Sequence, residues 1–225
     1  MFSIALDGPS GAGKSTLAKA MGAKLNFLHV DTGAMYRAIG VAALRAGVCT
    51  TDSEAVTALL PSIHIELRFG PQGQRIFLGE EDVSEAIRMP EASMAASNVS
   101  AIPAVRAFLL EQQRDLARSN NVIMDGRDIG TVVLPNATLK VFLTASPQAR
   151  AARRHKELVE KGHKVSYEQI LEEVKLRDYN DSTRAAAPLK QAEDAVLADT
   201  TQLNFEESLA LLLKIAANHG IHPVG

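Results

Sequence analysis

Residues 8–16 read Gly8-Pro9-Ser10-Gly11-Ala12-Gly13-Lys14-Ser15-Thr16, a stretch of the form G-x-x-x-x-G-K-[S/T]. The apolar run 2–6 precedes it, and residues 17–25 follow with apolar side chains at helical spacing. Strand, glycine loop and helix in this order are typical of a phosphate-binding loop, because glycines let backbone N–H groups turn inward and the helix N-terminus favours an anion. A flexible glycine turn ahead of a helix is the alternative. The sequence predicts a nucleotide-binding loop.

All nine residues of this loop are candidates for binding ATP. Lys14 is expected to reach the β- and γ-phosphates, and the Ser15 hydroxyl is expected to take one position on Mg²⁺. Asp125 ends the apolar run 122–124 and is the candidate for the acidic residue that assists the metal. A turn-forming role for Asp125 before Gly126 is an equal alternative.

The composition limits the classes of protein. The 225 residues are 46% hydrophobic, enough for one core with small insertions, and the net charge of −2 gives no general attraction to nucleic acid or membranes. The single cysteine, Cys49, cannot form an intramolecular disulfide and is expected to be a small buried side chain. The N-terminus lacks a signal segment, and no apolar stretch has membrane-spanning length. We therefore expect a soluble cytoplasmic protein without a membrane or nucleic-acid partner.

Short apolar runs alternate with helical patterns along most of the chain. Such alternation predicts an α/β fold, a parallel sheet of about five strands covered by helices, with ligands beyond the carboxyl ends of the strands. Asp31 or Thr32 is expected to cap one helix, Ser146 lies before a proline at a helix start, and Ser166-x-x-Gln169 is a capping box. The expected strands are 2–6, 27–30, 122–124, 139–143 and 195–198, and the expected helices are 17–25, 35–46, 103–118, 148–161, one from 166, and 205–218.

One segment breaks this alternation. Residues 63–69 alternate between apolar and polar, residues 70–73 form a turn, and 75–78 return as a second strand. An antiparallel hairpin does not belong to a series of parallel strands. Residues 60–95 are therefore predicted to be a small insertion on the α/β body.

Arginines collect after the expected strand ends and along two helices. Each helical stripe is often a solvated face, which is the alternative for both stripes. Beside a phosphate loop they also suit phosphoryl transfer, which needs positive charge around several phosphates. The residues concerned are Arg37, Arg127, the stripe Arg150, Arg153 and Arg154, and the stripe Arg177, Asp181 and Arg184.

Asp128 follows Arg127 directly and would repel a phosphate. A carboxylate at this place could accept a hydrogen bond from the exocyclic amine of cytosine, whereas uracil has a carbonyl there. A salt bridge to a neighbouring arginine is the alternative.

Five motifs, in order and spread over nearly the whole chain, resemble bacterial cytidylate kinases. They are GPSGAGKST (8–16), DTGAMYRA (31–38), AASNVS (95–100), DGRDIGTVV (125–133) and RDYNDSTRAAAPL (177–189). The resemblance implies transfer of the γ-phosphoryl group of ATP to CMP or dCMP with Mg²⁺. It also implies a P-loop kinase body with its core at 1–59, 96–147 and 166–225, an NMP-binding insert at 60–95 and a helical lid at 148–165.

The resemblance also implies roles for individual residues. It assigns the cytosine ring to Thr32, Arg106 and Asp128 with Arg184 nearby, the acceptor phosphate to Arg37 and Arg127, the pentose to Ser97, Arg177 and Asp181, and substrate binding to Tyr36. Lys14, Arg127, Arg153 and Arg154 are the catalytic candidates, with one lid arginine expected to stabilise the transferring group. A monomer is expected.

Rival functions differ in one observable each. A kinase for UMP, AMP or shikimate would share the fold and differ in its acceptor. A GTPase-like switch would hydrolyse nucleotide slowly without any acceptor, but no N-K-x-D sequence occurs. Nucleic-acid binding is the weakest alternative, because the chain has three tyrosines and no tryptophan for stacking.

Overall fold

The computed structural model describes residues 1–70, 73–160 and 162–223. It divides into two compact units. The first unit comprises Met1–Leu28 and Asn120–Gly225, and the second comprises His29–Ser119. Each unit has its own apolar core. The two units are therefore described separately.

The larger sheet is parallel and has the strand order β2-β6-β1-β7-β8; four of its strands lie in the first unit, and β2 runs from Leu28 into the second unit. β1 pairs in parallel with β6 and with β7, and β7 pairs with β8. In this register Leu6 lies opposite Asp125 and Asp7 opposite Gly126, so β1 and β6 end at the same edge. The strands are β1 (Ser3–Asp7), β2 (Leu28–Asp31), β6 (Val122–Gly126), β7 (Leu139–Thr144) and β8 (Val196–Asp199). The predicted fold class, with five parallel strands, is confirmed.

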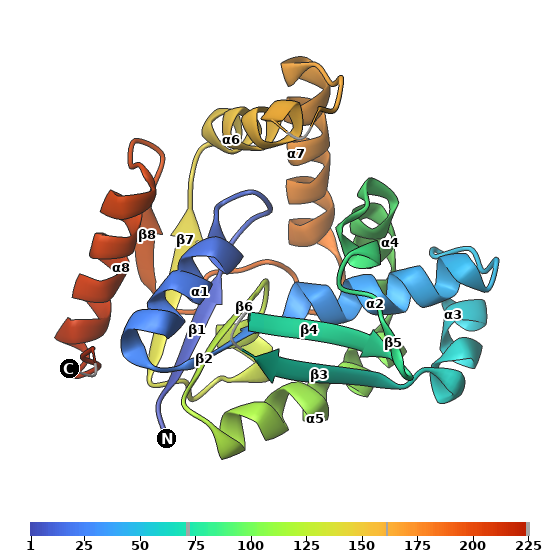
Figure 1. Ribbon diagram of the computed structural model, residues 1–225, viewed down its shortest axis with the longest axis horizontal. Coiled ribbons are helices and arrows are strands. Elements are labelled where there is room, and N and C mark those ends of the chain that lie inside the picture. The colour runs from blue at the N-terminus through green and yellow to red at the C-terminus, as the bar shows by residue number, and fades with distance from the viewer. Residues whose placement is uncertain (71–72, 161, 224–225) are drawn as a thin grey trace. The chain divides into compact units, whose positions relative to one another are not determined.

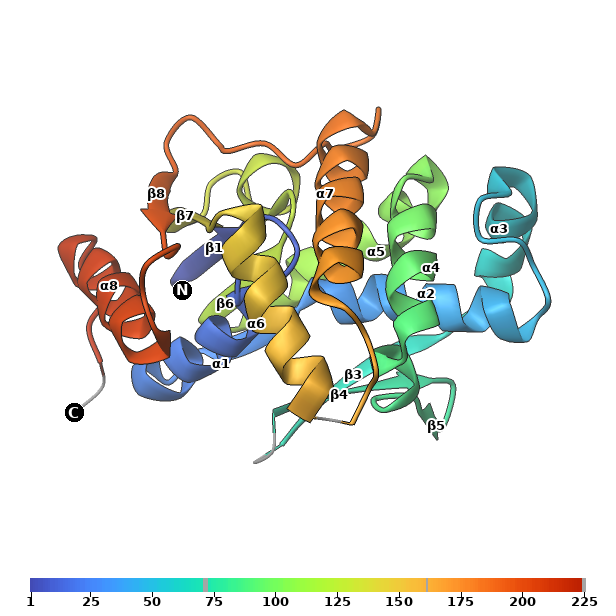
Figure 2. The same ribbon diagram turned by 90° about the horizontal axis from the view of Figure 1, so that it is seen from above.

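Helices pack on this sheet through apolar faces. α1 and α8 lie side by side, with Met21 and Leu212 fully buried between them and the strands (Figure 1). α6 and α7 pack against each other around a smaller cluster that includes Ala151 and Val174 (Figure 2). The helices are α1 (Lys14–Leu25), α6 (Pro147–Glu160), α7 (Tyr167–Thr183) and α8 (Phe205–Asn218), and a π-helical turn, η3 (Ile129–Val133), follows β6.

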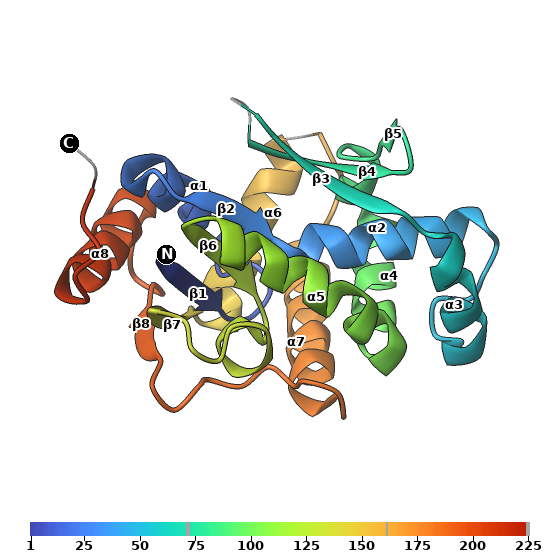
Figure 3. The same ribbon diagram turned by 90° about the horizontal axis from the view of Figure 1, so that it is seen from below.

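The second unit combines helices with a three-stranded antiparallel sheet of order β3-β4-β5. α2 and α4 cross closely, since a Cβ on Gly40 would lie 2.8 Å from Cβ of Ala95. Figure 3 shows β3 and β4 running beside α2. The elements are α2 (Thr32–Arg45), α3 (Ser53–Leu59), η1 (Leu60–Ser62), β3 (Ile65–Gly70), β4 (Gly73–Leu78), β5 (Glu81–Asp82), η2 (Ala86–Arg88), α4 (Pro90–Ser100) and α5 (Pro103–Ser119).

Several local predictions are confirmed. The hairpin of β3 and β4 pairs Ile65 with Leu78 and Gly70 with Gly73, while the turn residues 71–72 and the predicted helix end at 161 lie outside the described residues. Asp31 caps α2 by accepting from the Ala34 N–H at 3.0 Å. The Ser146 hydroxyl caps α6, and the Ser166–Gln169 capping box opens α7.

Other local predictions are wrong or incomplete. Cys49 is exposed, because it lies in the loop between α2 and α3, where its sulfur contacts the Thr51 hydroxyl at 3.2 Å. Arg184 is not on the α7 face, because the helix ends at Thr183 and Arg184 is extended. Neither α3 nor α4 was predicted. The first buries only Val56, and the second buries small side chains that give a weak apolar periodicity.

Within the described residues, no single helix is long and apolar enough to cross a membrane; only α4 and α5 together, bent by 99°, pass the test of length and composition.

Candidate active site

The glycine loop between β1 and α1 has the backbone that its sequence predicts. Gly8, Gly11 and Gly13 all have positive φ angles, of 151°, 75° and 87°. A Cβ on Gly8 would lie 2.0 Å from the carbonyl oxygen of Leu143, so no other residue fits there. Gly13 is the N-cap of α1 and brings no side chain to its first N–H groups. These groups form the end of a twelve-residue helix, which is an anion-binding geometry.

Lys14 is buried inside this loop, with 6% of its surface exposed. Its Nζ donates to the carbonyl oxygen of Pro9 at 2.8 Å. Burial and, to a smaller extent, the positive charge of Arg127 lower the pKa of Lys14 to about 7, while the carboxylates of Asp125 and Asp181 act in the opposite direction. The charged ammonium group has therefore lost its contact with water, and a bound anion would stabilise it.

Ser15 and Asp125, the two predicted metal ligands, are in contact. The Ser15 hydroxyl donates to Oδ2 of Asp125 at 2.7 Å, which joins the first turn of α1 to the end of β6. No group of three or more His, Cys, Asp or Glu side chains that could hold a metal occurs among the described residues. Two hard oxygens suit a Mg²⁺ ion that takes its remaining ligands from phosphates and water. The donor set fits the expected metal.

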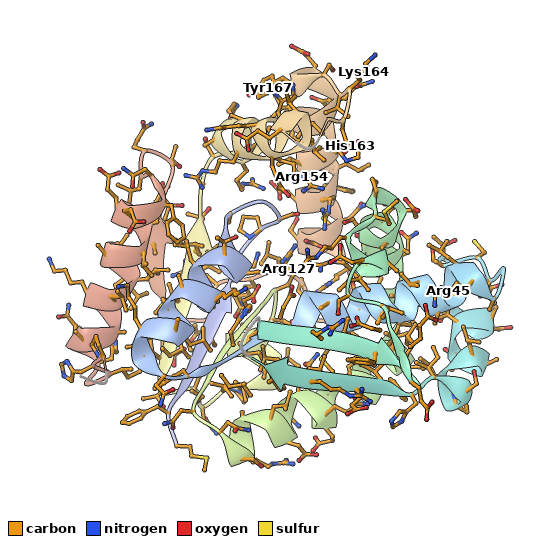
Figure 4. All side chains as sticks on the ribbon, viewed as in Figure 1. Arg45, Arg127, Arg154, His163, Lys164 and Tyr167 are labelled. Atoms are coloured by element: carbon orange, nitrogen blue, oxygen red, sulfur yellow. The ribbon has the colours of Figure 1, made fainter. Side chains whose placement is uncertain are left out.

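Basic and acidic side chains meet beyond the carboxyl end of β6 in the first unit. Arg127 donates from Nε to Oδ2 of Asp181 at 2.7 Å, and Figure 4 labels Arg127 at this strand end. Burial raises the pKa of Asp181, but Arg127, Arg184 and Arg177 outweigh this and hold it below its usual value. The carboxylate of Asp181 is therefore ionised and holds the arginine in a defined orientation.

Asp128 is buried next to this group. Its Oδ1 lies 3.6 Å from a guanidinium nitrogen of Arg184, and the two side chains are 5% and 7% exposed. Arg184 also donates to the carbonyl oxygen of Ala187 at 2.6 Å. The salt bridge named as the alternative for Asp128 is thus present, and the base-reading role stays a prediction. The structure brings five of the predicted residues together in the first unit: Arg127, Asp128, Arg177, Asp181 and Arg184.

The other candidates lie in the second unit, on α2, α4 and α5. Arg37 lies 3.7 Å from Oδ2 of Asp31, the residue that caps this helix. Arg106, on α5, has its guanidinium 5.6 Å from the ring centre of Tyr36 and donates to the carbonyl oxygen of Ser100 at 3.3 Å. Thr32 is buried in the first turn of α2, and Ser97 lies on α4. They form a second group of hydroxyls and arginines.

The three arginines of α6 have different surroundings. Arg150 is 3% exposed and binds Asp178 through both terminal nitrogens, at 2.9 and 2.5 Å, and the carbonyl oxygen of Ser10 at 2.9 Å. Arg153 donates to the carbonyl oxygens of Thr200 and Leu203. Arg154 is 37% exposed and pairs with Glu157 at 2.9 Å, and it is labelled on α6 in Figure 4.

Arg150 therefore fixes the glycine loop to α6 and α7. The solvated-face alternative is wrong for Arg150 and Arg153. The catalytic roles of Arg153 and Arg154 stay predictions.

A family model of cytidylate kinases matches residues 4–218. The chain belongs to the cytidylate kinase family. A cytidylate kinase of Carboxydothermus hydrogenoformans is 51% identical over 212 residues, which cover 94% of this chain and 96% of that protein. One of Caldicellulosiruptor bescii is 50% identical over 214 residues, 95% of each chain. The family resemblance of the five motifs is confirmed.

A solved structure of a shikimate kinase from Bacteroides thetaiotaomicron is also similar to this chain. It has a TM-score of 0.46 at 16% sequence identity and covers 96% of this chain and 98% of that chain.

Reasoning from the sequence missed two groups in this member of the cytidylate kinase family. The Arg150–Asp178 pair joins residues far apart in the sequence, and no local pattern announces it. Asp7 is buried at the end of β1, where it accepts hydrogen bonds from the backbone of Ile129 and Gly130. A signal for Asp7 existed, because an acidic residue ending an apolar strand is the feature that singled out Asp125.

Proposed function

We propose that this chain transfers the γ-phosphoryl group of ATP to CMP or dCMP, forming ADP and CDP or dCDP. Membership of the cytidylate kinase family supports both the reaction class and the acceptor. The observation that carries the proposal is the buried carboxylate of Asp128, next to Arg127, in the unit that holds the glycine loop. A site that bound only phosphate would have only cationic side chains here, because a carboxylate repels phosphate. The carboxylate of Asp128 therefore points to a second role.

On the donor side, the backbone N–H groups of residues 8–16 would hold the phosphates of ATP. Lys14 would exchange the carbonyl oxygen of Pro9 for a β- or γ-phosphate oxygen. Phosphate contact would replace the solvation that burial removes, so the charged form of Lys14 would be favoured in the complex.

Ser15 and Asp125 are the residues that would hold Mg²⁺. The ion would supply positive charge that neutralises the phosphates. Their contact at 2.7 Å keeps the two oxygens together before any ligand binds.

The acceptor needs residues for its base, its phosphate and its pentose. Asp128, Arg184, Thr32 and Arg106 would address the cytosine ring. Arg127 and Arg37 would bind the phosphate of CMP, since a guanidinium fork matches phosphate geometry. Tyr36, Ser97, Arg177 and Asp181 complete the substrate-binding set, the last three at the pentose.

The chemistry needs little from the protein beyond positioning and charge. The attacking group is a phosphate oxygen of CMP, which is already anionic at neutral pH, so no general base is required. Lys14 and the arginines would stabilise the transferring group while water is excluded. Residues 148–165 would form the lid, bringing Arg153 or Arg154 to the phosphates, and residues 60–95 would form the NMP-binding insert.

The test of acceptor recognition is Asp128→Asn. The asparagine keeps the side-chain shape but can turn an N–H donor to the base. It should therefore donate a hydrogen bond to the uracil carbonyl, which the carboxylate of Asp128 cannot do. The ratio of kcat/KM for CMP to that for UMP should fall about tenfold to a hundredfold, which corresponds to roughly 1–3 kcal/mol. An unchanged ratio would show that Asp128 does not read the base.

The proposal includes a monomeric state and a cytoplasmic location. Equilibrium sedimentation of the purified chain with and without CMP tests the first, and fractionation of cells tests the second.

A further inference from the structure

The residue after Arg127 occupies an unusual helix cap. Asp128 is the N-cap of η3, and an aspartate there ordinarily accepts a hydrogen bond from one of the first N–H groups of its own helix. Its carbonyl oxygen accepts from the N–H groups of Val132 and Val133, but its side chain makes no capping hydrogen bond. The first N–H groups of η3 are therefore capped from elsewhere.

Asp7, at the end of β1, supplies this cap. The Ile129 N–H donates to its Oδ1 and the Gly130 N–H donates to its Oδ2, both at 2.7 Å. Asp7 is 4% exposed, and its backbone lies opposite Gly126 in the pairing of β1 with β6. A carboxylate that accepts one N–H on each oxygen fixes both the position and the direction of the turn.

Gly130 leaves little space for a side chain at this approach. A Cβ built on it would lie 3.3 Å from Oδ2 of Asp7 and 3.1 Å from Cδ of Lys140. Lys140 is itself held by Asp194, with Nζ 2.8 Å from both carboxylate oxygens. The glycine thus leaves room for the carboxylate of Asp7 against the turn.

We infer that Asp7 is a positioning residue for the acceptor site: by capping η3 from β1, it lets Asp128 turn its carboxylate to Arg184 rather than to its own helix. The inference rests on the proposed function, in which this carboxylate reads the cytosine amine. Asp7 also precedes Gly8 directly, so the same strand end carries the phosphate loop and orients the acceptor carboxylate.

A purely structural role for Asp7 makes a different prediction. A general loosening of the strand end would disturb the adjacent phosphate loop as much as η3, so the KM for ATP and the KM for CMP would rise together. A positioning role changes acceptor recognition selectively.

The decisive variant is Asp7→Asn in the full chain. It keeps the side-chain shape, but its amide nitrogen cannot accept one of the two N–H groups. Asp128 is then expected to turn toward its own helix. We expect the CMP-to-UMP ratio of kcat/KM to fall at least fivefold and the KM for CMP to rise several-fold, while the KM for ATP changes less than twofold. An equal rise of both KM values, or an unchanged ratio, overturns the inference.

Asp52→Ala is the control for a lost helix cap. Asp52 also accepts two backbone N–H groups, from Glu54 and Ala55, but both donate to Oδ1, so alanine rather than asparagine is needed to remove this cap. Asp52 caps α3 and belongs to neither group of site residues, so its loss should leave the CMP-to-UMP ratio as in the wild type. A fall in the ratio with Asp52→Ala would show that any lost helix cap has this effect, which also overturns the inference.

Two further variants separate this inference from the proposed function. If Asp128→Asn lowers the ratio and Asp7→Asn does not, the positioning role of Asp7 fails alone; if Asp128→Asn has no effect, base reading by Asp128 fails and the inference fails with it. In the double variant, Asp7→Asn should add little to the change in ratio, because both act through one carboxylate.

If Asp7→Asn does not fold, Gly130→Ala replaces it as the test. We then expect a fall in the CMP-to-UMP ratio, and an unchanged ratio would contradict the inference.

Discussion

The hydroxyl of Ser15 lies 2.7 Å from Oδ2 of Asp125, so the first turn of α1 and the end of β6 share a hydrogen bond at the mouth of the glycine loop. The register of β1 with β6 makes this contact possible, because Leu6 lies opposite Asp125 and the loop leaves β1 one residue later. Parallel pairing thus brings a hydroxyl and a carboxylate together from residues 110 apart in the sequence.

Removing either oxygen should weaken the response to Mg²⁺. We expect Ser15→Ala and Asp125→Asn each to raise the half-saturating Mg²⁺ concentration about tenfold at saturating ATP and CMP, since each removes one partner of a two-residue site. Because the two side chains touch, the double variant should lose less than the product of the single effects. Initial rates over a Mg²⁺ titration measure this. Ser62→Ala, which removes a hydroxyl that donates to the Leu59 carbonyl, is the control, and an unshifted titration for Asp125→Asn contradicts the assignment.

Lys14→Ala should abolish most activity without loss of structure. The ammonium is the only lysine charge in the described part of the glycine loop, and losing such a group costs about 10²–10³ in kcat. Since burial lowers the pKa of Lys14 to about 7, the folded chain bears a solvation cost that alanine removes. The melting temperature at pH 7 should therefore be no lower than that of the wild type. Activity close to wild type would contradict the role of the loop.

Asp7 should make the free energy of unfolding depend on pH. Burial raises the pKa of Asp7 from 3.8 to about 6; the N–H groups of Gly130 and Ile129 and the charge of Lys14 oppose the rise, and Asp128 adds to it. The folded state therefore holds the proton more tightly than the unfolded state. Between pH 3.8 and 6 this group's contribution to the free energy of unfolding should fall, as pH rises, by about 3 kcal/mol.

Urea unfolding from pH 4 to pH 7.5 measures this effect as the difference between the wild type and Asp7→Asn, which cannot titrate. Relative to Asp7→Asn, the free energy of unfolding of the wild type should fall as pH rises to about 6 and then stay constant. A difference in the free energy of unfolding that is constant with pH, or in which the wild type becomes relatively more stable as pH rises, contradicts the raised pKa.

The Arg150–Asp178 pair predicts an asymmetric mutational effect. Arg150 is 3% exposed and Asp178 is 28% exposed, so Asp178→Ala leaves a buried guanidinium without its carboxylate. We expect a loss of about 2–3 kcal/mol in the free energy of unfolding. Glu172→Ala removes the exposed pair with Lys175 and should leave the melting temperature as in the wild type. A similar result for the two variants would contradict the structural role of the buried pair.

The sequence predicted those features that depend on local pattern. The glycine loop, the five strands and the helix caps at Asp31, Ser146 and Ser166 follow from spacing and residue type, and the structure has all of them. The pairing of Ser15 with Asp125 could be expected, because parallel strands end at one edge of a sheet.

The features that the sequence did not predict depend on contacts between residues far apart in the chain. Arg150 and Arg154 are four residues apart on one helix, yet Arg150 is buried against Asp178 and Arg154 is 37% exposed, because only tertiary packing decides which side of the stripe is covered. Likewise, Asp7 reaches a turn 122 residues away, and no periodicity reports a contact of that kind. The cap of η3 depends on β1 and β6 ending at the same edge of the sheet.

One measurement tests the central claim most directly: the rate of ADP formation from ATP and Mg²⁺ with CMP, dCMP, UMP, AMP, GMP or shikimate as the acceptor. The account predicts rapid turnover with CMP and dCMP and little with the other four. Preferred turnover of AMP, UMP or shikimate, or tight nucleotide binding without transfer to any acceptor, would contradict it.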